Sequence, residues 1–482
     1  MSRAFYLLVT AVLLKNYLFY EQGSGLNYFA FALLLLALVL WRKSGLFRER
    51  NMQLTTAGFL LTGFTAVYYG NSHTLILYVV SVFLLIGYSS VTQLSPYVSA
   101  FNGILSSLGL ASFQASSQWL TSSSNRPTHR QLIRQFRVLL LPFLVTLGFY
   151  GLYYWANPDF SLFDRSYVLD TDYIFLTMLG FIWLPSLVFP YSAKVFAEAD
   201  LKLTNTLSRI RGRYKGHVLG LKWEYRQGVV MLGMLNLLLL VFLVFEGLMF
   251  GDVQQQQTAY DFSQSVHDSV NVLIFSILLA ITLMLFYFRK NLNFFPKNRT
   301  LIRLAYTWIF LNLLLLGVTT YTNMLYIENN GLTFKRIGVY FWLFQTGCGL
   351  FTTLYKIHYK KSIAFLFRIN SWVCYFTLIV FTAVPWTSII TTYNLSRAQI
   401  LDLEYLKEFL PYNLPQLQES VYVYSQSLEL KADLLKSAQT FQKQYKQNPH
   451  TWQSWNYADW KINQYIETHP FSSNSSIPTS CL

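Results

Sequence analysis

The sequence predicts an all-α protein, a polytopic transmembrane helical bundle of about 11 spans with a C-terminal extracytoplasmic helical tail. Three observations predict this class. Of the 482 residues, 53% are hydrophobic and 12% are charged, whereas soluble domains carry about 25% charged residues. Long apolar runs such as FALLLLALVL do not alternate as membrane β-strands do. Basic residues also gather between alternate runs. The composition excludes an ordinary cytosolic enzyme, a disordered chain and a disulfide scaffold.

The spans are predicted from runs of apolar residues. A helix needs about 20 largely apolar residues to cross the hydrocarbon, and interfacial Tyr and Trp can complete a shorter run. The predicted spans are 4–20, 26–41, 55–70, 72–90, 138–155, 172–190, 228–250, 268–288, 304–325, 337–355 and 370–390. The first resembles a signal peptide, but Lys15 interrupts it and no clear cleavage site follows. We therefore expect an uncleaved first span, with Lys15 snorkelling outward.

Orientation follows from the positions of the basic residues, because cationic segments resist translocation. With the N-terminus inside, the segments that carry 26 Lys and Arg residues all lie on the inner side: 1–3, 42–54, 91–137, 191–227, 289–303 and 356–369. The predicted outer loops carry three, Arg165, Lys335 and Arg336. This sorting predicts a multi-pass protein of the cytoplasmic (inner) membrane, with a cytoplasmic N-terminus and an extracytoplasmic C-terminus.

The predicted organisation has four parts. They are an N-terminal four-span part (1–90), an interfacial or re-entrant segment with a basic inner loop (91–134), a seven-span core with a basic inner loop at 191–227 (135–390), and the outer tail (391–482). Residues 93–125 contain no charge. A single crossing there would place Arg126 to Arg137 outside, so we expect this stretch to lie in the interface or re-enter the membrane.

The inner loop 191–227 and the outer tail have different charge patterns. Arg209, Arg211, Arg213 and Lys215 alternate along the loop. Retention of the loop on the inner side explains them more simply than a contact with anionic lipids or a nucleotide. The tail holds seven basic and eight acidic residues, so we expect no nucleic-acid partner. A lipid bilayer is the expected partner of the whole chain.

Three helices are predicted in the tail. Ser396 and Gln399 form an S-x-x-Q capping box before an apolar periodic stretch. A second helix is expected over about 416–447, and a third over about 451–466 that carries three Trp residues: Trp452, Trp455 and Trp460. Such an aromatic stripe is more typical of a helical core than of a binding groove, but a partner in the envelope that docks on residues 391–482 remains open.

Motifs for catalysis are absent from the sequence. HExxH, GxxxxGK[ST], GxGxxG before a helix and GxSxG do not occur. Cys348, Cys374 and Cys481 form no CxxC pair, so neither a disulfide framework nor a zinc knuckle is indicated. With these motifs absent, we expect no metal and no cofactor. His267 and Asp268 open the eighth predicted span and are the candidates for acid–base chemistry at the outer face. A polar collar that faces water is the simpler interpretation of these two residues.

Candidate binding residues lie at both sides of the predicted membrane. Arg289, Asn291 and Asn293 close the eighth span on the inner side, where a guanidinium and amides could hold a lipid phosphate or mark an interfacial stop. Arg336 opens the tenth span on the outer side, as part of a lipid-headgroup contact or a polar collar. Few charges are expected inside the spans, which disfavours ion-coupled transport.

Several segments together resemble one family. They include GLNYFAFALLLLAL, LKWEYRQGVVMLGMLNLLLLV, FSILLAITLMLFYFRKNLNFF, NNGLTFKRIGVYFWL and FRINSWVCYF, and in the tail TTYNLSR, LDLEYLKEFLPYNLPQL and WQSWNYADWKINQYI. These resemble bacterial multi-pass membrane proteins with the domain of unknown function 4153/4173, in the form of Bacteroidetes-like organisms. The resemblance implies an integral inner-membrane protein and implies no activity. Positions matching its motifs are His267, Arg289, Asn291, Asn293, Gly331, Arg336, Tyr393 and Asn394, and Pro385-Trp386 departs from it.

Three classes of function remain open on the sequence. A non-enzymatic scaffold or sensor of the cell envelope, whose tail docks a partner, is favoured because catalytic motifs and intramembrane charges are scarce. A transporter or lipid flippase is the first alternative, suggested by the number of spans. A membrane enzyme that acts at the outer face around His267 and Asp268 is the second.

Overall fold

The structure is a computed structural model. It describes residues 2–114, 146, 149–150, 152–153, 156, 170–209, 220–253, 275–288, 291–398, 401–420, 428–447 and 451–469. These residues form helices and no named strand, which confirms the all-α prediction for the described part. They belong to two compact units, Met1–Glu198 with Thr451–Asn456, and Ala199–His450 with Tyr457–Leu482.

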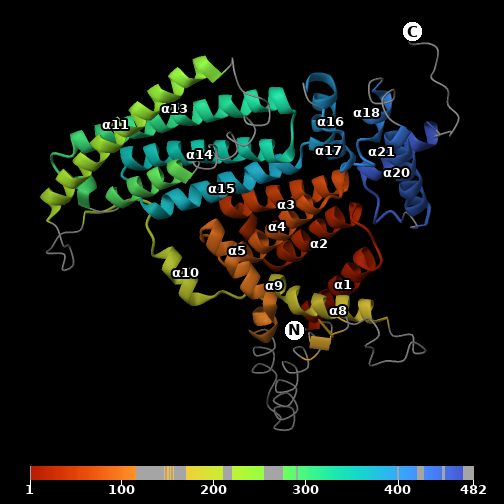
Figure 1. The fold of residues 1–482 in the computed structure, drawn as a ribbon. Coiled ribbons are helices and arrows are strands. Elements are labelled where there is room, and N and C mark those ends of the chain that lie inside the picture. The colour runs from red at the N-terminus through yellow and green to blue at the C-terminus, as the bar shows by residue number, and fades with distance from the viewer. Residues whose placement is uncertain are drawn as a thin grey trace, which may run out of the picture. The chain divides into compact units, whose positions relative to one another are not determined.

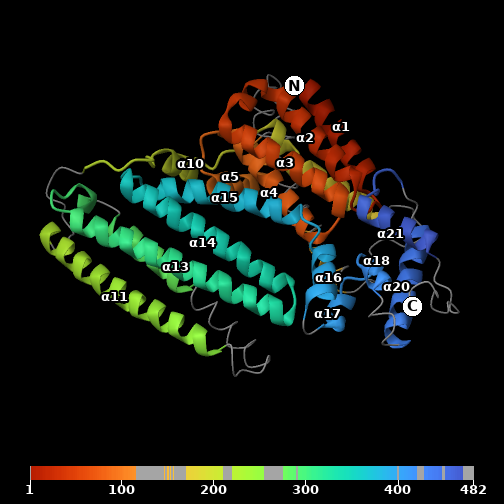
Figure 2. The ribbon, with the colours of Figure 1, turned by 90° about the horizontal axis from the view of Figure 1, so that it is seen from above.

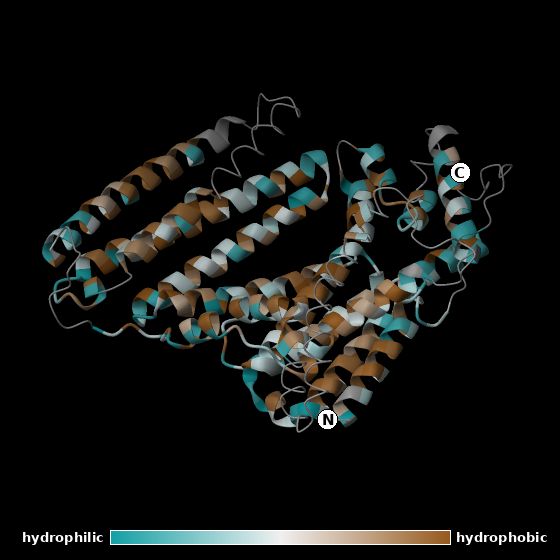
Figure 3. Ribbon diagram, turned by 90° about the horizontal axis from the view of Figure 1, so that it is seen from below, coloured by the Kyte–Doolittle hydropathy of each residue, from teal (hydrophilic) through white to brown (hydrophobic). Residues whose placement is uncertain are grey.

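Six helices in the described part are long and apolar enough to cross a membrane: Leu26–Arg48, Ser72–Ser90, Leu221–Leu248, Arg299–Asn330, Phe334–His358 and Ile363–Thr382. Three shorter apolar helices are Tyr6–Phe19, Asp172–Val188 and Phe275–Tyr287. Each of these nine overlaps a predicted span. The predicted span 55–70 falls on α3 (Arg50–Tyr69), whereas 138–155 lies mostly outside the described residues. Figure 3 shows the resulting contrast, with brown along the long helices and mostly teal beside the C-terminus.

From α1 to α5, the helices of the first unit follow one another through short connections (Figure 1). They are α1 (Ser2–Phe19), α2 (Leu26–Lys43), η1 (Ser44–Arg48), α3, α4 (Ser72–Ser90), α5 (Pro96–Leu105), η2 (Ser106–Leu110), α8 (Thr171–Trp183) and α9 (Pro185–Val188). A further helix, α10 (Lys194–Leu201), crosses the boundary between the units. Helix α4 begins where the Asn71 side chain accepts a hydrogen bond from the Thr74 amide, a regular N-cap.

Helices α4 and α5 touch through their backbones. A Cβ on Gly103 would lie 1.9 Å from the Phe83 carbonyl oxygen, and one on Gly87 would lie 2.0 Å from the Ser99 carbonyl oxygen. The paired positions run in opposite directions along the chain, so the two helices are antiparallel. In lipid there is no hydrophobic driving force between apolar helices, so their association depends on close packing. Small residues such as these glycines permit that packing. Beyond Leu105 the helix kinks at η2, where Gly109 has φ +94°.

Two polar contacts mark opposite ends of this bundle. At one end the Arg42 guanidinium on α2 donates to the carbonyls of Ser89 on α4 and Leu187 on α9. A cation at these helix C-termini is electrostatically favourable. Near the other end, Lys15 is 4% exposed and donates to the Leu176 carbonyl of α8. The predicted snorkelling is therefore wrong, because α8 packs against α1 and covers the ammonium group.

A short piece of the tail, Thr451–Asn456, belongs to the first unit. The Trp455 and Gln453 carbonyls accept hydrogen bonds from the amides of Leu26 and Asn27 at 3.0 and 2.9 Å. The Trp452 ring lies 6.3 Å from the ring of Tyr17. These contacts lie at the start of α2, opposite to the end that carries Arg42. The predicted helix 451–466 is therefore wrong at its beginning, since these backbone groups pair with α2 instead.

The second unit contains the longest helices. They are α11 (Leu221–Val253), the short apolar helix Phe275–Tyr287, η3 (Asn291–Phe294), α13 (Arg299–Asn330), α14 (Phe334–His358), α15 (Ile363–Thr382) and α16 (Trp386–Arg397). Figures 1 and 2 show α13, α14 and α15 side by side. A cluster that includes Leu232, Met284, Ile309 and Leu350 fills the space between α11, the helix Phe275–Tyr287, α13 and α14. Outside it, Arg368 on α15 pairs with Asp200 at 3.3 Å.

Two predicted boundaries near the tail are wrong. The predicted span 370–390 is displaced, because Ser362 caps α15 early by accepting from the Phe365 amide, and Pro385 precedes a new helix. Ser396 does not cap a helix either. It lies inside α16, where its hydroxyl donates to the Thr392 carbonyl. Asp402 instead accepts from the Tyr405 amide and caps α17 (Leu403–Lys407).

The remaining tail helices of the second unit are α18 (Leu414–Glu419), α20 (Leu428–Gln447) and α21 (Tyr457–Thr468), which Figure 2 shows beside α16 and α17. The predicted helix 416–447 thus appears as α18 and α20, separated by residues outside the described part. Helix α21 covers most of the predicted third helix. Buried Leu414, Ala438, Ile462 and Ile466 hold α18, α20 and α21 together.

Candidate functional site: the tail clamp

The turn between α13 and α14 is built around one glycine. Gly331 follows the end of α13 and has φ +79°, a conformation that side chains with a Cβ rarely adopt. Its amide donates to the Ile327 carbonyl at 2.9 Å. Thr333 then caps α14, because its side chain accepts from the Arg336 amide at 3.4 Å. The sequence Gly-Leu-Thr therefore ends one helix and starts the next within three residues.

Arg336 closes this turn from inside. Its Nη1 donates to the Asn330 carbonyl at 2.7 Å and to the Gly331 carbonyl. The guanidinium carbon lies 4.0 Å from the centroid of the Tyr326 ring. The residue is 8% exposed, and among the described residues no ion pair involves it. The negative end of the α13 dipole and the face of an aromatic ring therefore take the place of a carboxylate.

Asn394 attaches helix α16 to the same turn. Its Oδ1 accepts from the Leu332 amide at 2.6 Å, and its Nδ2 donates to the Leu332 carbonyl at 2.9 Å. The amide side chain thus satisfies both backbone groups of one residue, as a neighbouring β-strand would. A Cβ on Gly331 would lie 2.7 Å from the Asn394 Oδ1. The glycine is required both for its conformation and for this close approach.

Tyr405 adds a third attachment from α17. Its hydroxyl accepts from the Phe334 amide at 2.8 Å, at the first turn of α14. Burial raises the pKa of this phenol, so it stays neutral at physiological pH. The Tyr405 ring packs edge-on against Phe409, which in turn contacts Phe334. We call the set Gly331, Leu332, Phe334, Arg336, Asn394 and Tyr405 the tail clamp.

An apolar core lies beneath the tail clamp. Buried residues come from α14, α16, α17, α18 and α20: Ile337, Ile390, Leu406, Leu417 and Leu434. Asn413, fully buried, donates to the Thr391 hydroxyl and to the Leu406 carbonyl. The first part of the tail is therefore joined to the α13–α14 hairpin by hydrogen bonds and by a shared core.

The opposite end of α14 carries a different polar contact. Lys356 is 1% exposed and its Nζ donates to the Phe288 carbonyl at 2.7 Å. The candidates Asn291 and Asn293 lie nearby in sequence on η3, where Asn293 is buried and its carbonyl accepts from Asn298 at 2.9 Å. Because Arg336 and Lys356 are about 30 Å apart along a helix, they belong to separate sites.

The predicted site residues therefore divide into three groups. Arg336 is in the tail clamp, together with Gly331 and Asn394, which the family resemblance also singles out. Asn291 and Asn293 are on η3, close in sequence to Phe288, whose carbonyl is bonded by Lys356 at the end of α14 opposite to Arg336. His267, Asp268 and Arg289 lie outside the described residues. The acid–base and phosphate-binding roles of these side chains remain predictions.

Sequence reasoning missed Tyr405 and Lys356. Tyr405 lies in a polar tail segment, and nothing in its neighbours signals that its hydroxyl pairs with a backbone amide 71 residues away. Lys356 follows a predicted span and is therefore expected at the inner surface of the membrane, as one of the basic residues of segment 356–369. Its burial depends on the position of the Phe288 carbonyl, which no sequence pattern reveals. No group of three potential metal ligands occurs among the described residues.

The helices described above define a class, that of multi-pass membrane proteins with a helical fold. Comparison with known families then identifies the chain more closely. The family described as a domain of unknown function (DUF4153) matches residues 7–420, and the chain belongs to this family. The matched region includes the whole tail clamp and ends within the tail. No curated protein and no solved structure matches the chain.

Proposed function

We propose that this protein is a non-enzymatic scaffold or sensor of the bacterial cell envelope, whose tail, residues 391–482, docks an envelope protein on the outer side of the cytoplasmic membrane. The observation that carries the proposal is the tail clamp. Asn394 and Tyr405 bond to the α13–α14 turn, and buried Ile337 and Leu406 share a core beneath it. A partner bound to the tail would therefore act directly on two long membrane helices.

The proposed topology has 11 spans, with the N-terminus inside and the C-terminus outside. The contacts of the first unit support it. Arg42 gathers the C-terminal ends of α2, α4 and α9, three helices that the basic residues predict to end inside. Thr451–Asn456 of the tail pairs with the opposite, N-terminal end of α2. Within the first unit, Arg42 and this piece of the tail lie at opposite ends of α2, which supports the proposed arrangement of the tail and the basic inner segments on opposite sides.

The second unit supports the same directions. Asn236 on α11 donates to the Leu304 carbonyl on α13, and Gly228 lies against Leu301, so these two helices run in parallel. Lys356 and Phe288 meet at the ends of two helices that are both predicted to return inward. The structure describes 93–114 of the stretch 93–125, and there the antiparallel contact of α5 with α4 favours the re-entrant alternative over a helix lying flat in the interface.

A cross-linking experiment on the full chain tests the proposed docking. A photoreactive amino acid is placed at Thr440 on α20, which lines a groove of about 340 Å³ next to Leu410 and Pro411. The matched control carries it at Trp342 on α14, which is 55% exposed. We expect one discrete envelope protein to be captured from position 440 and not from position 342. Adducts at neither position, or the same protein at both, would count against docking on the tail.

A further inference from the structure

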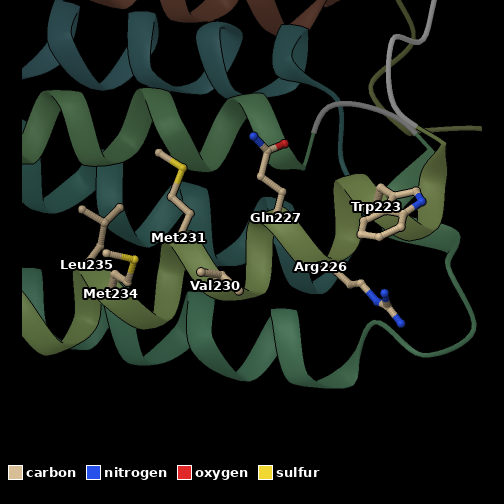
Figure 4. A pocket seen from close by; sticks show the side chains of 7 residues that line it. All are labelled: Trp223, Arg226, Gln227, Val230, Met231, Met234 and Leu235. Carbon is tan, nitrogen blue, oxygen red and sulfur yellow. The ribbon is translucent and has the colours of Figure 1, made fainter.

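Helix α11 carries a groove of about 620 Å³ that no part of the tail clamp uses. Figure 4 shows the side chains that line it, all from one face of α11 between Trp223 and Leu235. Polar groups gather at one end of this face and apolar groups at the other. We call this feature the α11 groove.

The polar end of the α11 groove consists of Trp223, Arg226 and Gln227. The guanidinium carbon of Arg226 lies 5.1 Å from the centroid of the Trp223 ring, which is 60% exposed. Among the described residues no ion pair involves Arg226. A guanidinium held over an aromatic ring keeps its planar fork of donors available, and that fork fits a phosphate. Trp beside a cation is also typical of the interface between membrane and water.

The apolar end consists of Val230, Met231, Met234 and Leu235. Val230 and Met234 are 61% and 68% exposed, although they lie within a helix apolar enough to cross a membrane. Arg226, Val230 and Met234 are spaced four residues apart, so they form one continuous stripe along the helix. Flexible Met side chains adapt to an irregular apolar ligand such as an acyl chain.

The length of the α11 groove matches one leaflet of a bilayer. From Trp223 to Leu235 the helix rises about 18 Å. Half of the hydrocarbon core of a bilayer is about 15 Å thick. A headgroup held at Arg226 would therefore leave its acyl chain beside Met234 and Leu235, close to the centre of the membrane. A second transmembrane helix is a poorer fit, because close helix pairs need small residues and this face presents Val, Met and Leu.

We propose that the α11 groove binds one anionic phospholipid, with its phosphate on Arg226 and one acyl chain along Val230 and Met234. This inference rests on the membrane placement proposed above and not on the docking of the tail. The lipid belongs to the leaflet that faces the basic inner loop, where anionic headgroups attract Lys and Arg.

The test uses the full chain purified in detergent, and native mass spectrometry counts the retained lipid during titration with phosphatidylglycerol. Parallel titrations use phosphatidylcholine and inorganic phosphate. Arg226→Gln removes the charge, and Met234→Trp fills the apolar end without changing any charge. Arg209→Gln is the matched control, because Arg209 is an exposed basic residue of the same predicted inner loop that does not line the groove.

We expect one phosphatidylglycerol per chain and an affinity at least about fivefold lower for Arg226→Gln, the loss typical of one basic residue at an anionic membrane. Met234→Trp should weaken retention as well, while Arg209→Gln should not. Equal retention of phosphatidylcholine, equal loss in Arg209→Gln, or full retention in both groove variants would overturn the proposal. Binding of inorganic phosphate as tight as that of phosphatidylglycerol would show an ion site that does not recognise an acyl chain. That result would also overturn the proposal.

Discussion

Helices α4 and α11 are both strongly apolar, yet they are packed in opposite ways. In the apolar window of α4, 61% of the residues are buried, against 22% in that of α11. Helix α4 meets α5 backbone to backbone at Gly87 and Gly103, whereas a Cβ on Gly233 or Gly247 of α11 would meet nothing within 4 Å in the described part of the chain. Hydrophobicity identifies both as candidate membrane helices, and the small residues of α4 permit a closer helix contact than those in the middle and at the end of α11.

The sharpest way to break this comparison is to enlarge one glycine of each kind. Gly103→Leu would force a side chain into the Phe83 carbonyl, so α4 and α5 would have to separate. We expect a loss of about 3 kcal/mol in the free energy of unfolding. Thermal stability of the full chain in detergent, followed by size-exclusion chromatography, measures it. Gly233→Leu is the control and should be close to neutral, so equal effects of the two changes would remove the contrast.

The tail clamp can be tested in the same way within the second unit. Asn394→Leu leaves the amide and the carbonyl of Leu332 without their partners, which costs about 2–3 kcal/mol. We expect faster amide exchange across 332–334 and earlier proteolysis of the tail. Asn463→Leu on α21 serves as control, because the Asn463 amide nitrogen donates to Glu467 within the same helix. Unchanged exchange in Asn394→Leu would show that the clamp does not hold the tail.

A smaller effect is expected at the glycine of the clamp. Gly331→Ala places a Cβ at φ +79° and against the Asn394 Oδ1, so it should destabilise the turn by about 1–2 kcal/mol. When Asn394→Ala is already present, the contact between the new Cβ and the Asn394 Oδ1 is gone. Gly331→Ala should then cost only the free energy of holding alanine at this positive φ. A double-mutant cycle by thermal unfolding measures this coupling. Strictly additive effects would mean that Gly331 and Asn394 do not meet.

The mildest prediction concerns pH in the tail. The Tyr412 hydroxyl donates to Asp459 at 2.9 Å, and burial together with this carboxylate raises the pKa of the phenol above its usual range. Because the pKa of Tyr412 is higher in the folded than in the unfolded chain, the neutral phenol stabilises the fold. This stabilisation is fully present below the unfolded pKa near 10 and is lost as the pH rises above it. Tail proteolysis should therefore accelerate above about pH 10, and less so in Tyr412→Phe. An identical pH profile of tail proteolysis in the unchanged chain and in Tyr412→Phe would contradict the role given to the Tyr412–Asp459 contact.

Much of the fold was predictable because apolar length and cation position are local properties of the sequence. The runs around 72–90 and 304–325 mark α4 and α13, and the family resemblance named Gly331, Arg336 and Asn394. What sequence could not supply were long-range backbone contacts. Trp452 and Trp455 look like one face of a helix, yet the carbonyls beside them pair with the start of α2. Tyr405 and Lys356 likewise act on backbone groups distant in sequence.

The central claim is that the tail lies across the membrane from the basic loops. The most direct measurement fuses alkaline phosphatase or green fluorescent protein after Leu482 in otherwise identical chains. We predict an active phosphatase and a dark fluorescent protein, because phosphatase folds outside the cytoplasm and the fluorescent protein folds inside it. A bright fluorescent fusion with an inactive phosphatase would contradict the 11-span topology and the docking of an outer partner.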